Sequence, residues 1–173
     1  MGKVKSRCWV TALNDRLINE LGIIRGSRDL GIQLQPAGFD LSASEIHRYV
    51  SRGFVGFRSK RLPKYEIIEP KDGVWCLGQG VYRIVYNEVV SVPDDVIGFC
   101  LPRSTLLRCG ATVYCAFWDP GYIGRGEGIL HVLNPNGLEL EVGARVAQLV
   151  FIKLIEKPSK TYSGSYQYER VKG

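Results

Sequence analysis

Five short segments of the 173-residue chain combine residue types that could bind a phosphorylated ligand or cleave it. In residues 101–108 (LPRSTLLR), Arg103 and Arg108 flank the hydroxyls of Ser104 and Thr105. The free N–H groups at the start of a helix, a hydroxyl and a fixed cation together make a good seat for a phosphate. A plain helix cap with two surface arginines explains the same residues equally well.

A second segment, residues 116–124 (AFWDPGYIG), places a carboxylate at the end of an apolar run. The Asp-Pro-Gly tripeptide is by itself a turn signature. Because Asp119 ends an apolar run, we expect its carboxylate at the rim of a pocket, where it could orient a water molecule. Tyr122 is close enough in the sequence to flank the same pocket.

Three further segments offer ligand contacts, each with a structural alternative. Asp40, in residues 34–41, could hold a hydrated divalent cation or cap a turn. Gln148 interrupts an apolar strand, and a buried amide must be hydrogen-bonded either to the backbone or to a ligand. Residues 161–168 (TYSGSYQY) could form a C-terminal segment that stacks on a base and binds phosphates, or they could fray.

The pattern around these residues predicts a mostly β protein. Leu13, Leu17, Ile18 and Leu21 recur at helical spacing before Gly22, which predicts one helix near the N-terminus. Many short strands at the spacing seen here are typical of a jelly roll, a β-sandwich or a small barrel. The β-rich runs, separated by Gly, Pro and Asn turns, cover residues 74–77, 81–92, 96–101, 111–118, 128–133, 138–142 and 146–155.

The composition is that of a globular protein, with 45% apolar and 23% charged residues. No apolar run approaches the ~20 residues of a membrane span, and the N-terminus lacks a signal-peptide core, so we expect neither a membrane protein nor a secreted one. The net charge of +6 favours acidic partners, either nucleic acid or small phosphates. One dense basic run, residues 52–64, is expected to be a solvated loop rather than a nucleic-acid site.

The five cysteines form no Cys-x-x-Cys pair, and their number is odd. This pattern favours buried free thiols in a reducing compartment over disulfides or a zinc site. The residues concerned are Cys8, Cys76, Cys100, Cys109 and Cys115.

Taken in order, the segments resemble the motifs of the trimeric dUTPase and dCTP deaminase superfamily. Residues 37–41 (AGFDL) are similar to the first dUTPase motif and residues 102–104 (PRS) to the second. Asp119 with Tyr122 resembles the third motif, and residues 143–149 (GARVAQL) resemble the fourth. The ending Tyr162-x-Gly164-x-Tyr166-Gln167 looks like that of the deaminases, so the nearest resemblance is to archaeal dUTPases built on a deaminase-like frame.

The resemblance implies a distorted β-barrel or jelly roll (a dUTPase-like β-clip) with a short N-terminal helix. Residues 1–155 would form this domain, and residues 156–173 would form a mobile tail that closes over the active site. The implied activity is Mg²⁺-dependent hydrolysis of dUTP to dUMP and pyrophosphate. The implied setting is a cytoplasmic homotrimer with shared active sites, and no membrane or nucleic-acid partner is expected.

The resemblance also assigns roles to individual residues. Asp119 and Ser104 would be catalytic, and Asp40 would contact the metal ion through water. The substrate would be bound by Arg103, Arg108, Tyr122, Gln148, Tyr162, Tyr166 and Gln167.

Two other functions remain open from the sequence. A dCTP deaminase, including one that also forms dUMP, needs a glutamate on the strand after Asp-Pro-Gly, and counting back from Asn134 puts His131 at that place. Glu127 would serve only if the apparent insertion around Arg125 is placed differently. The third interpretation is a basic β-barrel that binds nucleic acid without catalysis.

Overall fold

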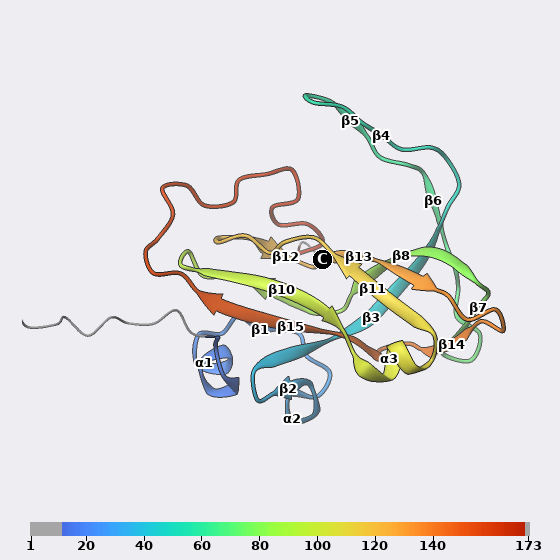
Figure 1. Ribbon diagram of the computed structural model, residues 1–173, viewed down its shortest axis with the longest axis horizontal. Helices are drawn as coiled ribbons and strands as arrows, with labels where there is room; N and C mark the ends of the chain where they lie inside the picture. The colour runs from blue at the N-terminus through green and yellow to red at the C-terminus, as the bar shows by residue number, and fades with distance from the viewer. Residues whose placement is uncertain (1–11, 172–173) are drawn as a thin grey trace, which may run out of the picture.

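The computed structural model describes residues 12–171, which form a barrel-like β structure (Figure 1). Its main sheet has eight strands, all paired antiparallel. Six of them form a continuous path, and the other two, β2 (Leu34–Gln35) and β6 (Tyr65–Ile67), pair only with β3. The expectation of a mostly β fold is confirmed. The path runs in the order β10 (Val96–Pro102), β15 (Arg145–Lys153), β3 (Gly38–Tyr49), β8 (Gly80–Tyr86), β13 (Glu127–Val132) and β11 (Ala111–Cys115).

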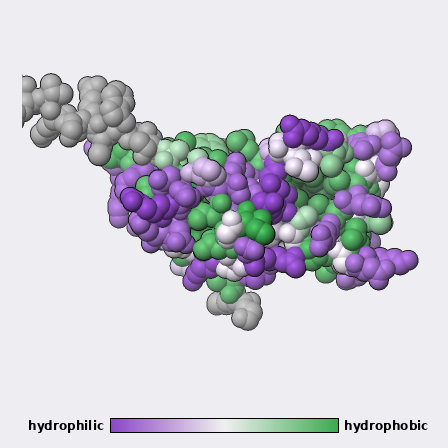
Figure 2. Space-filling model, turned by 90° about the horizontal axis from the view of Figure 1, so that it is seen from below, coloured by the Kyte–Doolittle hydropathy of each residue, from purple (hydrophilic) through white to green (hydrophobic). Residues whose placement is uncertain are grey.

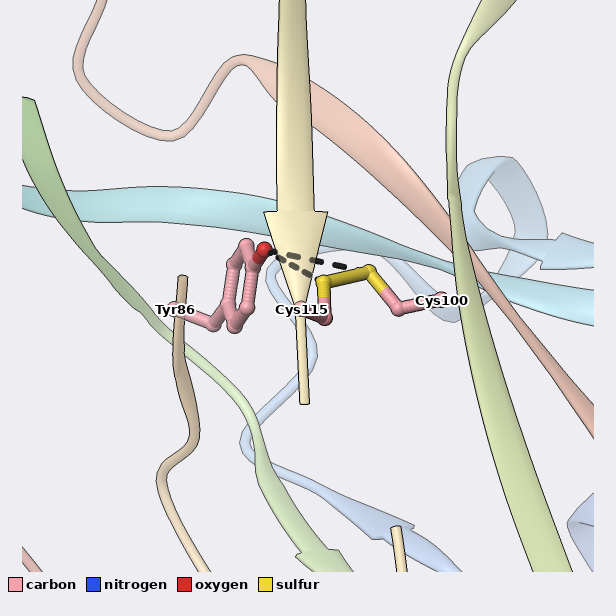
Figure 3. The surroundings of a disulfide bond; sticks show 3 residues. All are labelled: Tyr86, Cys100 and Cys115. Carbon is pink, nitrogen blue, oxygen red and sulfur yellow. Dashed lines mark hydrogen bonds between the residues drawn. A yellow bond between two sulfur atoms is a disulfide. The ribbon is translucent and has the colours of Figure 1, made fainter. Parts of the chain in front are cut away.

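The two ends of this path, β10 and β11, meet along a seam that nearly closes the barrel. Gly98 and Trp118 form a two-way backbone bridge across it, with N···O distances of 2.9 and 3.2 Å. A disulfide joins Cys100 to Cys115 across the same seam, with the two Cα atoms 5.8 Å apart (Figure 3). The Tyr86 hydroxyl lies 3.0 Å from the Cys115 sulfur.

The prediction of free thiols was therefore wrong for Cys100 and Cys115. The seam brings together two strands whose cysteines are 15 residues apart in the sequence, and no local spacing signals such a pair. Cys76 and Cys109 are free, as predicted, but exposed rather than buried. Cys8 lies outside the described residues.

Smaller elements surround the barrel. Three strands make a second sheet, β1 (Ile24–Arg25), β9 (Val89–Ser91) and β12 (Ile123–Gly124). Strand β7 (Val74–Leu77) pairs with β14 (Leu138–Glu141), and β4 (Phe54–Val55) pairs with β5 (Lys60–Arg61). The β4–β5 ribbon projects from the body of the molecule, so residues 52–64 are mostly exposed, as expected, but contain two short paired strands (Figure 1).

The helices are short. The predicted N-terminal helix is α1 (Asp15–Glu20), and the Asn14 side chain caps it by accepting from the Leu17 N–H at 3.0 Å. Gly22 follows in the left-handed region at φ +59°, where glycine is favoured. The other two helices are α2 (Leu30–Gln33) and α3 (Ser104–Arg108). None of the helices between residues 12 and 171 has the length and apolarity to cross a membrane.

Each predicted run contains a strand, and the run at 81–92 is divided between β8 and β9. The strands that were missed are β3, the longest, and the short strands β1, β2, β4, β5, β6 and β12. Strand β3 carries the buried polar side chains Asp40, Ser42 and His47, which hide its apolar pattern. It nevertheless supplies core residues; the fully buried large side chains of the core include Phe39, Leu41, Ile46, Ile84, Leu130, Leu149 and Phe151.

Candidate active site

Asp119 lies in the wall of a cavity of about 350 Å³. The chain leaves β11 at Cys115, and the Trp118–Gly98 bridge fixes the residue just before Asp119. A tight turn follows, in which the Tyr122 N–H donates to the Asp119 carbonyl at 3.2 Å. Within residues 12–171 no donor contacts the Asp119 carboxylate, which leaves both oxygens available to a ligand or a water molecule.

Tyr122 lines the same cavity and is buried. Its ring packs edge-on against Trp118 and Tyr162, with centroid distances of 5.3 and 5.6 Å. Its hydroxyl donates to the Glu169 carboxylate at 2.9 Å. Burial, reinforced by the Glu169 carboxylate, raises the pKa of Tyr122 far above its ordinary value, and burial also raises the pKa of Glu169. The phenol therefore remains a protonated donor at neutral pH.

The C-terminal segment covers this loop of its own chain. The backbone N–H groups of Tyr162 and Tyr168 donate to the carbonyls of Pro120 and Ile123, both at 2.7 Å. Gln167 makes two bonds to the same loop, donating to the Gly121 carbonyl at 2.8 Å and accepting from the Ile123 N–H at 3.0 Å. The structure thus brings Tyr162 and Tyr166 to the cavity of Asp119, whereas the Gln167 amide docks the tail on the loop after Asp119.

A second group of candidate residues gathers where β10, β15 and β3 run side by side. Asp40 is 1% exposed, and its Oδ2 lies 3.0 Å from the Arg103 Nε and 3.0 Å from the Arg145 Nη1. Burial raises the pKa of Asp40, and the two arginines oppose that shift. The carboxylate therefore orients the two guanidinium groups, which remain partly exposed. This geometry favours positioning of Arg103 over the water-mediated metal contact predicted for Asp40.

Gln148 belongs to the same group because β15 places it between Leu101 of β10 and Asp40 of β3. The expectation that its amide is buried was wrong, and its role in binding a ligand stays a prediction. Its side chain is only half-buried, on the outward-facing side of β15, and it has no hydrogen-bond partner in the described part of the chain. A Cβ at Gly38 would lie 3.1 Å from the Gln148 Cγ, so the glycine leaves room for this side chain.

Ser104 and Arg108 are exposed on α3, beside Arg103. The expected cap by Ser104 or Thr105 was wrong, because the residue at the N-cap is Arg103, which makes no capping bond through its side chain. Ser104 is the first residue of the helix, and its hydroxyl does not cap the helix. Arg145 was missed as a site residue, although it lies within the GARVAQL segment that resembles the fourth motif.

The two groups lie at opposite ends of β10. Gly98 contacts Trp118 next to Asp119, whereas Arg103 follows the last residue of the strand. Five residues of extended chain separate Gly98 from Arg103, a distance of roughly 16 Å. A single described chain therefore does not bring Asp119 and Ser104 onto one small ligand.

A buried ionic network adjoins the Asp119 cavity and opens onto a larger one of about 760 Å³. Glu127 lines both cavities, and its carboxylate pairs with Arg83 and with Arg170 of the tail. Arg83 also donates to the His47 Nδ1 at 2.5 Å, which leaves the ring proton on Nε2, 2.9 Å from Glu45. Burial, with help from Arg83, lowers the pKa of His47. The sequence analysis singled out only Glu127 of this network.

His131 lies elsewhere. On β13 it pairs with Thr112 and Val81, and it lines neither of the two cavities. Its partial exposure fits the packed or interface residue expected for it.

The chain is similar to known proteins in both sequence and fold. Residues 12–154 match the dCTP deaminase-like family. The chain is 46% identical over 157 residues to a probable deoxyuridine 5'-triphosphate nucleotidohydrolase of Aeropyrum pernix, covering 91% of this chain and 98% of that one. It is 44% identical over 158 residues to a protein of the same name from Archaeoglobus fulgidus, covering 90% and 93% of the two chains.

Among solved structures, the fold is similar to that of the 2'-deoxycytidine 5'-triphosphate deaminase of Agrobacterium tumefaciens, with a TM-score of 0.65 and 19% identity. The alignment covers 83% of this chain but only 48%, about half, of the Agrobacterium chain. At that identity the likeness concerns the fold alone. The matched residues, the barrel and the high identity to full-length archaeal relatives lead to one conclusion: the chain belongs to the dCTP deaminase-like family.

Proposed function

We propose that this protein hydrolyses dUTP to dUMP and pyrophosphate, which makes it a dUTP diphosphatase. The observation that carries the proposal is the Asp119 carboxylate, which has no partner among residues 12–171 and lies in the wall of a cavity beside the buried Tyr122. The near full-length identity to archaeal relatives that bear this activity in their names supports the choice of substrate. A cavity of about 350 Å³ is of the size that accepts a small ligand.

In the mechanism, Asp119 orients a water molecule and takes its proton as the water oxygen attacks the α-phosphorus. The new P–O bond forms while the bond between the α-phosphorus and the bridging oxygen breaks, and pyrophosphate leaves. Tyr122 packs against the deoxyribose, where its buried ring leaves no room for a 2′-hydroxyl. The tail residues Tyr162, Tyr166 and Gln167 cover the nucleotide and exclude bulk water.

The phosphates are bound by the second group of residues. Arg103 supplies a guanidinium held in place by Asp40, and Arg145 supplies another. The Ser104 hydroxyl and the Gln148 amide donate to phosphate oxygens and stabilise the charge that develops during the reaction. Arg108, exposed in the last turn of α3, adds a cation at the edge of this group.

We further propose that the active enzyme is a homotrimer with shared active sites. The support is the distance of roughly 16 Å along β10 between the Asp119 group and the Arg103 group of one chain. In a trimer, the Arg103 group of a neighbouring chain would lie beside Asp119 instead. Apolar side chains are also exposed on the outer face of the barrel, where Tyr114 lies opposite Ile129 and Phe99 packs edge-on against Phe117. Figure 2 shows hydrophobic side chains reaching the surface among polar ones on another face. The exposed apolar residues of these strands and their loops include Val81, Phe99, Leu101, Tyr114, Phe117 and Ile129.

In this scheme residues 1–155 are the catalytic domain and residues 156–173 the closing tail. In the described structure the tail is docked on its own chain through Tyr162, Gln167 and Tyr168. The cytoplasmic location expected from the sequence agrees with a substrate drawn from the pool of free nucleotides.

The family is generally metal-dependent, and Mg²⁺ is our proposal for the ion. The described residues do not fit an ion held by the protein, since they contain no group of three or more His, Cys, Asp or Glu side chains that could hold one. Asp40 is already engaged by two arginines. Mg²⁺ is commonly held by substrate phosphates and water, so it would arrive with the nucleotide and shield its charge.

The geometry argues against deamination of dCTP by Glu127. Its carboxylate shares the cavity with Asp119, but it pairs with both Arg83 and Arg170. Both of its oxygens are engaged by these guanidinium groups and are not free to face a cytosine ring.

The test is to incubate the purified protein with Mg²⁺ and either dUTP or dCTP and to identify the products by chromatography. Conversion of dUTP to dUMP with dCTP unchanged is the expected result. Uracil nucleotides formed from dCTP would show that the protein is a deaminase, with Glu127→Gln as the next variant. If neither nucleotide is converted, the result favours the third interpretation, a basic β-barrel that binds nucleic acid.

A further inference from the structure

Residues 51–64 form a projection, here called the arm, which contacts the tail through Lys60 and lines the 760 Å³ cavity through Leu62 and Pro63. Its ribbon, β4–β5, extends away from the barrel beyond β6 (Figure 1). Val55 is 91% exposed and Phe57 is 98% exposed near its tip. A ribbon that displays its largest apolar side chains to water has a surface suited to another molecule.

The charge of the arm is one-sided. It contains five cations and no carboxylate: the cations are Arg52, Arg58, Lys60, Arg61 and Lys64. Within residues 12–171 none of them forms an ion pair. Only Lys60 has a polar side-chain contact, a 3.2 Å bond to the Tyr166 hydroxyl. The surface that covers the arm should therefore be acidic and should offer apolar contacts as well.

The chain itself carries a surface of this kind on the β7–β14 hairpin and the turn before it. Glu139 and Glu141 alternate with Leu138 and Leu140 along β14, so both carboxylates stand on the exposed side. Glu69 and Asp72 are exposed next to them, accompanied by one cation, Lys71. None of the four carboxylates is paired within the described residues. We call these four carboxylates the acidic hairpin.

The arm does not reach the acidic hairpin of its own chain. It points away from the barrel, whereas β7 and β14 lie against the body of the molecule (Figure 1). A contact between two different patches is heterologous, and repetition of such a contact around an axis closes a ring. Complementary charges would steer the contact and fix its register, while Val55 and Phe57 would be buried by it.

We infer that the arm of one chain docks on the acidic hairpin of a second copy. The inference rests on the homotrimer proposed above. It identifies a contact between neighbouring chains of the trimer that lies away from the Asp119 and Arg103 groups. Nucleic acid is the other polyanion that could attract the arm, because Phe57 could stack on a base. The exposed aliphatic side chains of Val55 and Leu62 favour a protein surface instead, since only a protein surface would bury them.

A charge exchange tests the docking. One variant combines Arg58→Glu with Arg61→Glu, a second combines Glu139→Lys with Glu141→Lys, and a third carries all four changes. Each of the first two should raise the concentration at which the oligomer half-dissociates by about tenfold or more, and the third should recover most of that loss. The matched control is Arg16→Glu with Lys157→Glu, which changes the net charge as much as the arm variant and should leave the oligomer intact.

The readouts are mass in solution across a dilution series, dUTP hydrolysis, and binding of a fluorescent single-stranded oligonucleotide. Unchanged oligomers in the first two variants, or no recovery in the third, would overturn the docking. Loss of oligonucleotide binding in the arm variant without a change of mass would assign the arm to nucleic acid instead. A wild-type protein that is monomeric at every concentration would refute the trimer and the docking with it, while the hydrolysis assay separately decides the activity.

Discussion

The hydroxyl of Tyr122 donates to the carboxylate of Glu169 at 2.9 Å, so a residue close to the C-terminus holds the side chain that packs beside Asp119. Glu169 lines the Asp119 cavity as well. The contact therefore fixes the tail against the wall of the cavity in which we propose that the nucleotide binds.

This contact predicts that docking of the tail depends on pH. Burial raises the pKa of Glu169 above its ordinary value of 4.5. A carboxyl whose pKa is raised in the docked state stabilises docking fully below the ordinary pKa, and that stabilisation is lost as the pH rises through the raised pKa. Limited proteolysis should therefore cut the tail more slowly at the acidic end of this range. In Glu169→Gln, which mimics the protonated form, this part of the pH dependence should vanish, and an unchanged pH profile would refute the assignment.

Asp119→Asn should abolish most hydrolysis and leave binding intact. Removing a general base costs about 10²- to 10⁴-fold in rate, whereas the amide keeps the size and shape of the side chain. Single-turnover hydrolysis of dUTP and binding of a non-hydrolysable dUTP analogue would separate the two effects. The matched control is Asp94→Asn, an exposed carboxylate outside both cavities. Activity within a few-fold of the wild type in Asp119→Asn would show that another group activates the water.

Asp40→Asn should weaken phosphate binding because it releases Arg103 and Arg145 from their common carboxylate. We expect a higher KM for dUTP and a fall in the free energy of unfolding of about 1–3 kcal/mol, since both guanidinium groups are partly exposed and water can compensate them. Asp40→Glu keeps the negative charge but should restore only part of the phosphate binding. The longer side chain moves the carboxylate that holds the two arginines. A variant with normal KM but poor response to Mg²⁺ would instead support the metal contact.

Removal of the metal should stop turnover without affecting the free protein. If Mg²⁺ arrives on the nucleotide, EDTA should abolish hydrolysis, and calorimetry should detect no Mg²⁺ binding until nucleotide is present. Tight binding of Mg²⁺ by the protein alone would contradict this, and repetition with Asp40→Asn would show whether Asp40 is responsible.

The disulfide across the seam should contribute measurably to stability. A cross-link that closes a loop of about 15 residues is worth about 3 kcal/mol in the chain-entropy account. Reduction, or the double variant Cys100→Ser/Cys115→Ser, should lower the melting temperature, and the reductant should have no further effect on the double variant. Cys76→Ser and Cys109→Ser are controls at exposed free thiols. Equal melting temperatures for oxidised and reduced protein would show that the backbone bridge alone holds the seam.

Local chemistry made much of the fold predictable. The N-terminal helix follows from the spacing of Leu17, Ile18 and Leu21 and from the stop at Gly22. Most strands follow from short β-branched and aromatic runs between turns. Strand β3 could not be recognised, because its buried polar groups are satisfied by distant partners. Ser42 donates to Glu88, 46 residues away, and His47 accepts from Arg83, 36 residues away.

In the candidate site, too, the contacts between residues distant in the sequence could not be predicted. Asp119, Arg103 and Gln148 stand in segments that resemble motifs, so the sequence could nominate them. The division of these residues between two ends of β10 depends on the Gly98–Trp118 bridge, which no local pattern records. Arg145 and Glu169 acquire their importance only through Asp40 and Tyr122, their partners in space.

The seam has a further consequence for how the protein behaves at high concentration. While the Gly98–Trp118 bridge and the disulfide hold β10 to β11, neither strand offers a free hydrogen-bonding edge at that point. An opened seam would expose two adjacent edges flanked by Phe99 and Tyr114, which is the kind of template on which strands of other molecules add. Closure of the barrel thus protects the protein from aggregation at the same place where it fixes the approach to Asp119.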